Sequence, residues 1–190
     1  MKVEKIILIG ASTGGPGRIH NILESLAGGI DGVLVIAQHM NASFVPSFIN
    51  QLKSITKLPL HAVDKQMIVE NGHVYICSYT TAIKCKAGAL YIEPVEDNIK
   101  TYNPRIDALF ASASELSCKL KILGVILTGI GDDGARGALE LHRSGGECMF
   151  ESEKSAAVYG MPRCASEMVP EAKVYDMDTI IYKIKKFGGA

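Results

Sequence analysis

The stretch IILIGASTGGPGR, residues 6–18, decides the fold of this 190-residue chain, because it joins an apolar run to a glycine-rich turn. An apolar run that ends in glycine is typical of a buried strand, and the residues after the turn have helical spacing. One serine, Ser12, lies inside the turn. Three interpretations are open: the turn cradles a phosphate, the serine is a nucleophile, or it is an ordinary turn or capping residue.

Strand-like and helical segments alternate along most of the chain, which is typical of a parallel sheet covered by helices on both faces. The middle differs, because residues 72–94 are rich in β-formers, with turn signals at Asn71-Gly72 and Ala87-Gly88 that predict an antiparallel hairpin. We therefore predict an α/β fold with a doubly wound, mostly parallel sheet in a Rossmann-like three-layer arrangement, and an antiparallel hairpin at one edge. The expected strands are 5–9, 33–37, 122–127 and 147–150, the expected helices are 17–26, 44–54, 107–120, 135–142 and 180–187, and residues 93–104 are expected to form a loop.

The composition indicates one globular domain covering residues 1–190. Hydrophobic residues make up 47% of the chain. Lys plus Arg and Asp plus Glu number 20 each, so there is no excess of basic residues that would favour binding of nucleic acid. No apolar run approaches the roughly 20 residues that span a bilayer, and no signal peptide is expected. The five scattered cysteines include no C-x-x-C pair, which favours reduced thiols in a cytoplasmic protein over a disulfide frame or a zinc site.

The glycine turn fits phosphate binding poorly. A phosphate loop needs a lysine after its last glycine, and Pro16 stands there although Gly10 and Gly15 have the required spacing. A dinucleotide fingerprint needs glycine where Ser12 stands, because a Cβ obstructs the approach of a pyrophosphate. The second predicted strand is also followed by Gln38 and His39 rather than by an acidic residue.

The nucleophile interpretation fits the turn better. Gly10-Ala11-Ser12-Thr13-Gly14 has the form G-x-S-x-G between a predicted strand and a predicted helix, the context of a nucleophile elbow. In such a turn the backbone N–H of Thr13 is placed to stabilise an oxyanion. The motif is short, so Ser12 as an ordinary turn residue remains the alternative at this point.

A base and an acid follow two other predicted strands. His39 is the first ionisable group after the second strand, and Asp132 and Asp133 lie in the glycine-rich turn after residues 122–127. Because ligands gather at the carboxyl edge of parallel sheets, we expect serine, histidine and an aspartate to meet there. Spacing does not decide which aspartate holds the imidazole and which caps the next helix, and Asp107 is explained as a helix N-cap. The remaining histidines are less well placed: His20, His61, His73 and His142.

These residues lie in a chain that resembles the catalytic domain of the bacterial chemotaxis protein-glutamate methylesterase, CheB. The segments that carry the resemblance are GASTGGP (10–16), QHM (38–40), GHVYI (72–76), RIDALFASAS (105–114), VILTGIGDDGARG (125–137) and AAVYGMP (156–162). The resemblance implies that Ser12, His39 and Asp133 are the catalytic residues. It also implies oxyanion stabilisation by backbone near Thr13 and in the turn with Ile130 and Gly131, and a Thr13 hydroxyl placed to orient the imidazole. The chain departs from the family at Asn41, which usually is proline, and at Ile130, which usually is methionine.

The family resemblance further implies hydrolysis of glutamate methyl esters on the cytoplasmic helices of chemoreceptors, with deamidation of receptor glutamines, and neither a metal nor a cofactor. No nucleic acid and no direct membrane insertion are expected. The family's familiar full-length form carries a phosphorylatable receiver domain, and we expect none within these 190 residues. Two functions of other classes remain as alternatives: a nucleotide-binding α/β module and a non-catalytic receptor adaptor. A general small-ester hydrolase is a variant within the enzyme class.

Overall fold

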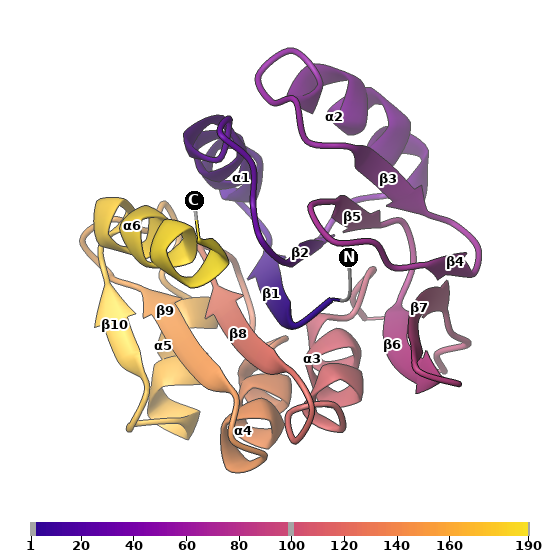
Figure 1. The fold of residues 1–190 in the computed structure, drawn as a ribbon. Helices are drawn as coiled ribbons and strands as arrows, with labels where there is room; N and C mark the ends of the chain where they lie inside the picture. Colours follow the sequence, from indigo (N-terminus) through magenta and orange to yellow (C-terminus); the bar gives the residue numbers. More distant parts are fainter. Residues whose placement is uncertain (1–2, 99–100, 190) are drawn as a thin grey trace.

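A seven-stranded parallel sheet forms the centre of the computed structural model, which describes residues 3–98 and 101–189. Its strand order is β10-β9-β8-β1-β2-β5-β3, and every neighbouring pair runs parallel. The chain leaves the central strand β1 toward one edge and later returns to its other side, so the order of strands reverses between β1 and β8 (Figure 1). The strands are β1 (Lys5–Ala11), β2 (Val33–Gln38), β3 (Leu60–Val63), β5 (Val74–Cys77), β8 (Lys121–Ile126), β9 (Glu147–Glu151) and β10 (Lys173–Tyr175).

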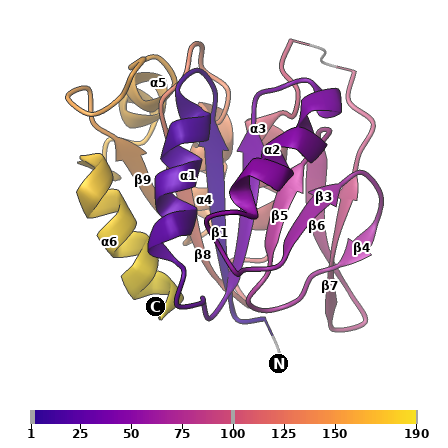
Figure 2. The ribbon, with the colours of Figure 1, turned by 90° about the horizontal axis from the view of Figure 1, so that it is seen from above.

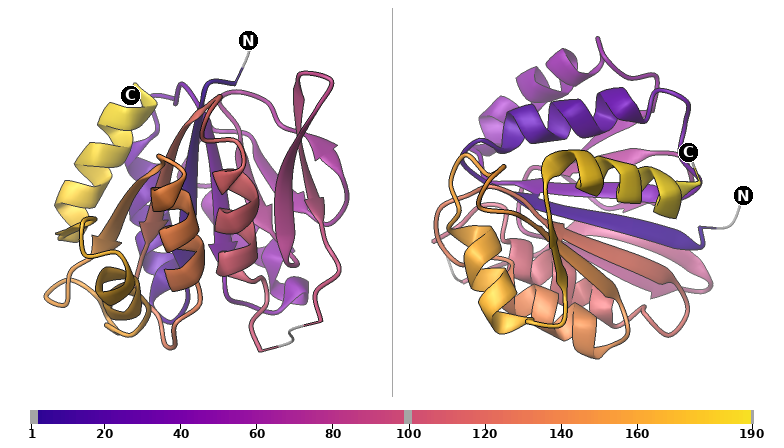
Figure 3. Two further views of the ribbon diagram at one scale, coloured as in Figure 1. Left: turned by 90° about the horizontal axis from the view of Figure 1, so that it is seen from below. Right: turned by 90° about the vertical axis from the view of Figure 1, so that its left-hand side faces the viewer.

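Helices cover both faces of this sheet. One layer contains α1 (Gly15–Ser25), α2 (Val45–Leu52) and α6 (Met177–Gly188), and lies in front of the sheet in Figure 2. The other layer contains α3 (Ile106–Ser114), α4 (Ala135–Arg143) and α5 (Met161–Met168), and Figure 3 shows the sheet between the two layers. The predicted doubly wound α/β fold is therefore confirmed.

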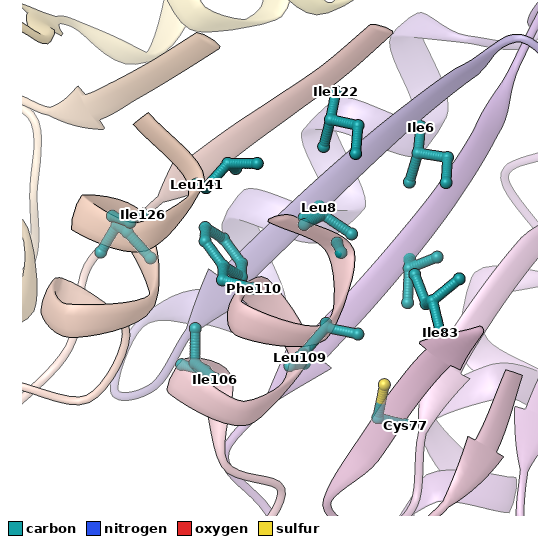
Figure 4. Packing of buried hydrophobic residues seen from close by; sticks show 14 of the residues in the cluster. Ile6, Leu8, Cys77, Ile83, Ile106, Leu109, Phe110, Ile122, Ile126 and Leu141 are labelled. Atoms are coloured by element: carbon teal, nitrogen blue, oxygen red, sulfur yellow. The ribbon is translucent and has the colours of Figure 1, made fainter. Parts of the chain in front are cut away.

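Two hydrophobic cores follow from the alternation of side chains along the strands. Ile7 and Ile9 of β1 point toward α1 and α6, whereas Ile6 and Leu8 point toward α3 and α4. All four are fully buried, because a parallel sheet between two helix layers has no solvent-facing side. Figure 4 shows the core on the α3 and α4 side of the sheet, where Phe110 of α3 packs near Leu8.

A three-stranded antiparallel sheet in the order β4-β7-β6 lies beside the β5 and β3 end of the main sheet (Figure 1). Its strands are β4 (Met67–Ile68), β6 (Thr81–Lys86) and β7 (Ala89–Pro94). The predicted hairpin is present as β6 and β7, and both turn residues, Ala87 and Gly88, have the positive φ angles of a tight hairpin turn. The segment Val74–Cys77 instead belongs to the parallel sheet, so the Asn71-Gly72 turn leads into a parallel strand.

The structure corrects several of the expected elements. The helix expected over 107–120 begins at Ile106 and ends at Ser114, and Arg105 rather than Asp107 is its N-cap residue. The elements that were not expected include the helix α5 and the short strands β3, β4 and β10. The first two residues of the loop expected over 93–104 belong to β7, and residues 99 and 100 lie outside the described part of the chain. Over residues 3–98 and 101–189, no helix has the length and apolar character needed to cross a bilayer.

Two histidines form a stacked pair near the sheet edge. His61 of β3 and His73, just before β5, have ring centroids 5.1 Å apart, and the Nε2 atom of His61 lies 3.0 Å from Nδ1 of His73. Tyr75 of the neighbouring strand β5 stacks on His61, and Oε2 of Glu70 lies 3.7 Å from Nε2 of His73. Burial lowers the pKa of His61 below 6.5, and the neighbouring His73 lowers it further, although Glu70 acts in the opposite direction.

We predict that the free energy of unfolding falls as the pH is lowered from 8 to 5. The pKa of His61 is lower in the folded protein than in the unfolded chain, so the unfolded chain binds more protons as the pH drops through about 6.5. Urea unfolding at several pH values should show that the free energy of unfolding decreases less between pH 8 and 5 in His61→Gln than in the wild type. His142→Gln serves as the control and should follow the wild type. An equal acid loss in His61→Gln and wild type would contradict the prediction.

Candidate active site

The three predicted catalytic residues follow three strands that end at the same edge of the sheet. Ser12 comes directly after β1, His39 directly after β2, and Asp133 lies in the turn between β8 and α4. The register pairs Ala11 with Gln38, so Ser12 and His39 are the next residues on neighbouring strands. The His39 N–H donates to the Ala11 carbonyl at 2.9 Å, which extends this pairing past the end of the sheet.

The imidazole of His39 is paired with Asp133. Its Nε2 lies 2.7 Å from Oδ2 of Asp133, and the two side chains expose only 11% and 1% of their surface. The carboxylate also accepts hydrogen bonds from the backbone N–H groups of Ile106, at 2.8 Å, and Asp107, at 2.9 Å. These two groups form the first turn of α3, where free amides and the helix dipole favour a negative charge. Asp133 is therefore held as a carboxylate, and the proton on the imidazole belongs on Nε2.

This geometry decides between the two aspartates in the turn. Asp133 contacts the imidazole, whereas Oδ1 of Asp132 accepts a hydrogen bond from the Tyr102 hydroxyl at 3.2 Å. The Asp132 carbonyl accepts the N–H of Ala135 at the start of α4. Asp132 thus lies at the rim of the site and Asp133 in its interior.

Asp107 caps α4 rather than its own helix. Its Oδ1 accepts the N–H groups of Gly134, at 2.9 Å, and Gly137, at 2.8 Å, which belong to the first turn of α4. Asp133, which precedes α4, binds the first turn of α3 in the same way, so each helix start is bound by an aspartate from the other segment. Burial raises the pKa of Asp107, and the charge of Asp133 raises it further, against the hydrogen bonds from Gly137 and Gly134.

Tyr102 lies over the imidazole and was not expected from the sequence. Its ring is stacked on His39, with centroids 5.0 Å apart and planes inclined by 10°. Burial and the carboxylate of Asp132 raise the pKa of Tyr102, so its hydroxyl remains a donor at neutral pH. Nearby, Arg105 pairs with both oxygens of Asp97 at 3.1 Å, which ties the two ends of the segment that carries Tyr102.

Gly131 provides the room for this stacked ring. A Cβ at Gly131 would lie 2.5 Å from the Tyr102 oxygen, and its φ of 94° is one that other residues rarely adopt. A side chain at residue 131 would therefore displace Tyr102 from His39.

The turns after β1 and β8 keep several backbone donors free. Among residues 3–98 and 101–189, no acceptor binds the N–H of Thr13, Ile130 or Gly131, whereas the N–H of Gly129 donates to the Val158 carbonyl at 3.0 Å. The free donors come from the two segments expected to stabilise an oxyanion, and Gly129 is excluded from that role. The Thr13 carbonyl is fixed by the hydroxyl of Thr128 at 2.9 Å, which holds the two segments together.

The Ser12 hydroxyl forms no hydrogen bond with the imidazole within the described residues, and neither does the Thr13 hydroxyl. Hydrogen bonds of catalytic groups often tighten only when substrate binds, so the roles of both hydroxyls stay predictions. Close packing surrounds Ser12, because a Cβ at Gly129 would lie 2.7 Å from the Ser12 Cβ. The glycine at residue 129 therefore leaves room for the serine side chain.

A buried glutamate supports the turn that follows β8. Glu151, at the end of β9, is fully buried and accepts the N–H of Thr128 at 2.8 Å. Arg18 of α1 pairs with its other oxygen at 2.9 Å, so the charge is compensated. The sequence predicts only a strand over residues 147–150 and gives no signal for this role of Glu151.

The chain is similar to known proteins in both sequence and fold. A model of the family described as CheB methylesterase matches residues 7–184. A crystal structure of the CheB methylesterase catalytic domain of Thermotoga maritima is similar with a TM-score of 0.88 and 29% identity, over 98% of this chain and 99% of that one.

Two curated relatives carry the name protein-glutamate methylesterase/protein-glutamine glutaminase. The protein of Methylobacillus flagellatus is 37% identical over 87% of this chain and 47% of its own length. That of Pectobacterium atrosepticum is 35% identical over 93% of this chain and 51% of its own length. The chain thus spans about half the length of these relatives.

We predict that Asp107→Ala lowers the free energy of unfolding by about 1–2 kcal/mol, because it leaves the first-turn N–H groups of α4 without their acceptor. Asp107→Asn retains an acceptor oxygen and should lose less. Chemical denaturation measures both. Asp178→Ala, which removes an exposed acidic residue from the first turn of α6, is the matched control. Equal losses of stability in Asp107→Ala and Asp178→Ala would show that the hydrogen bonds from Asp107 to the start of α4 contribute little.

Proposed function

This chain belongs to the CheB methylesterase family, and on that premise we propose that it is a serine hydrolase that removes methyl esters from glutamate side chains of chemoreceptors. We further propose that it deamidates receptor glutamines, and that residues 1–190 act as one catalytic domain. The observation that carries the proposal is the buried pair of His39 and Asp133, 2.7 Å apart, next to Ser12 on the neighbouring strand.

In the proposed reaction His39 acts as the general base. Nε2 is occupied by Asp133, so Nδ1 is the ring nitrogen that takes the Ser12 proton as Oγ attacks the ester carbonyl. Asp133 fixes the tautomer and stabilises the imidazolium that forms. The face of the Tyr102 ring stabilises the same positive charge, since a cation over an aromatic ring is favourable.

The free N–H groups of Thr13, Ile130 and Gly131 are the donors that we assign to the tetrahedral oxyanion, and one such donor is typically worth about 3 kcal/mol of the barrier. Collapse of the intermediate breaks the bond to the methoxy group, which leaves as methanol with the proton from His39. Water, deprotonated by His39, then attacks the acyl-serine and releases the glutamate. With glutamine as substrate, the group that leaves is ammonia.

The exposed apolar side chains around the site favour a protein as the substrate. Phe44, Tyr79 and Ile130 are large apolar side chains exposed by 64%, 47% and 62%. A hollow of about 560 Å³, lined by residues that include Met40, Tyr79 and Asn103, lies beside the segment that carries Tyr102. Exposed apolar groups at the edge of a site are typical of protein contact surfaces. We propose that the cytoplasmic helices of methylated receptors dock here, which places the reaction in the cytoplasm.

We predict that Ser12→Ala reduces methanol release from methyl-labelled receptor by at least about 10³-fold, because the nucleophile is lost. Its free energy of unfolding should stay within about 0.5 kcal/mol of the wild type. The control is Ser47→Ala, an exposed serine of α2, which should retain full activity. Persistent methanol release by pure Ser12→Ala would reject the nucleophile. Rapid hydrolysis of nitrophenyl acetate with little release from receptor would indicate a general small-ester hydrolase instead.

We predict that Tyr102→Ala lowers kcat by about 10-fold, because the stacked ring no longer stabilises the imidazolium; a loss near 1.4 kcal/mol corresponds to this factor. Tyr102→Phe keeps the ring and loses only the hydrogen bond to Asp132, so its kcat should stay within about 3-fold of the wild type. Steady-state kinetics on methylated receptor measures both. Equal losses in the two variants would assign the effect to the hydroxyl rather than to stacking.

A further inference from the structure

Gln38 connects the backbones of the proposed nucleophile and base. It is the last residue of β2 and only 2% of its surface is exposed. Its amide nitrogen donates to the carbonyl of Ser12 at 2.9 Å and to the carbonyl of His39 at 3.1 Å. The two hydrogens of one NH₂ group thus bind two residues that follow different strands and are expected to exchange a proton.

The other end of the Gln38 amide has no partner. Among the described residues, no donor reaches its buried Oε1 atom. A buried acceptor without a partner costs about 1–3 kcal/mol, and such groups are rare in folded proteins. Rotating the amide by 180° would point Oε1 at two carbonyl oxygens, so the orientation follows from its two acceptors. A methionine would fill the same space without this cost, which indicates that the donor function is what the position provides.

The start of α1 leaves room for this amide. A Cβ at Gly15 would lie 2.0 Å from the Gln38 Oε1 and 2.8 Å from the Cβ of Ala11. The Ser12 carbonyl also accepts the N–H of Gly15 at 2.9 Å, so it receives two hydrogen bonds. Gln38 therefore lies beneath the nucleophile turn and fixes the plane of the peptide that joins Ser12 to Thr13. The N–H of Thr13, one of the free donors described above, belongs to that same peptide.

We propose that Gln38 is a positioning residue that sets the distance between Ser12 and His39 and the direction of the Thr13 N–H. This inference rests on the proposed function. One NH₂ group that binds both carbonyls couples the two backbones, so a shift of either loop stretches a hydrogen bond to the other. Misplacement of reacting groups by about 1 Å can cost about 100-fold in rate, which makes such a coupling valuable.

Gln38→Met and Gln38→Glu test this role. Gln38→Met removes both donors at similar volume, and we expect kcat on methylated receptor to fall 10- to 100-fold with KM within 2-fold. The rate at which a fluorophosphonate probe labels Ser12 should fall by a similar factor. In Gln38→Glu, the protonated carboxyl group donates one hydrogen bond, whereas the carboxylate donates none and repels both carbonyls. Activity of Gln38→Glu relative to the wild type should therefore fall at least 5-fold as the pH rises from 5.5 to 8.

The control is Ile36→Val, two residues earlier on the same face of β2, which lowers stability without removing a polar contact. It should retain the wild-type kcat and labelling rate at a temperature where it is folded. If the role of Gln38 were purely structural, replacing it would lower Tm and leave kcat per folded molecule unchanged.

Wild-type kcat in folded Gln38→Met would overturn the inference. If that variant does not fold, the pH series of Gln38→Glu decides, and a ratio to wild type that does not change with pH overturns it. Failure of the wild-type protein to demethylate receptor would instead reject the proposed function, so the two failures are distinguishable.

Discussion

The site depends on one buried negative charge, that of Asp133. A carboxylate whose side chain is 1% exposed is stable only when its oxygens are bound, and here two N–H groups of α3 and the imidazole of His39 bind them. The imidazole orientation follows from this charge, because the ring must present a proton to it. The charge thus joins the packing of α3 against α4 to the chemistry at the end of β2.

The place of the site follows from the order of the strands. The sheet reverses its winding between β1 and β8, and the loops at the carboxyl ends of such strands diverge to opposite faces. The loop after β1 enters α1 on one face, and the segment after β8 enters α4 on the other. Ser12 and Asp133 therefore lie in loops that lead to opposite faces of the sheet, and His39 follows the neighbouring strand β2. The proposed serine hydrolase site takes its three groups from the segments that follow these three strands.

Much of this arrangement could be predicted from the sequence. Continuous apolar runs such as 33–37 mark fully buried strands, and polar residues just after them mark the functional edge. This pattern places Ser12 and His39 at that edge, as the structure has them, whereas the choice of Asp133 over Asp132 needs the family resemblance, which the contact with His39 supports. Other features had no local signal. Tyr102 reaches His39 from an irregular segment, and Asp107 caps a helix that begins 28 positions later in the chain, at Ala135. Such contacts depend on tertiary packing, which neither periodicity nor propensity encodes.

Residues 39 and 133 are separated by 94 positions, and every pairing within the main sheet is parallel. Contacts between distant parts of a chain are slow to form, because the entropy of closing long loops is lost before the contacts compensate for it. The strands β1, β2 and β8 must all be in register before the imidazole meets its carboxylate. Pairing of His39 with Asp133 is thus a late event in folding, and it should lag behind the return of helical circular dichroism.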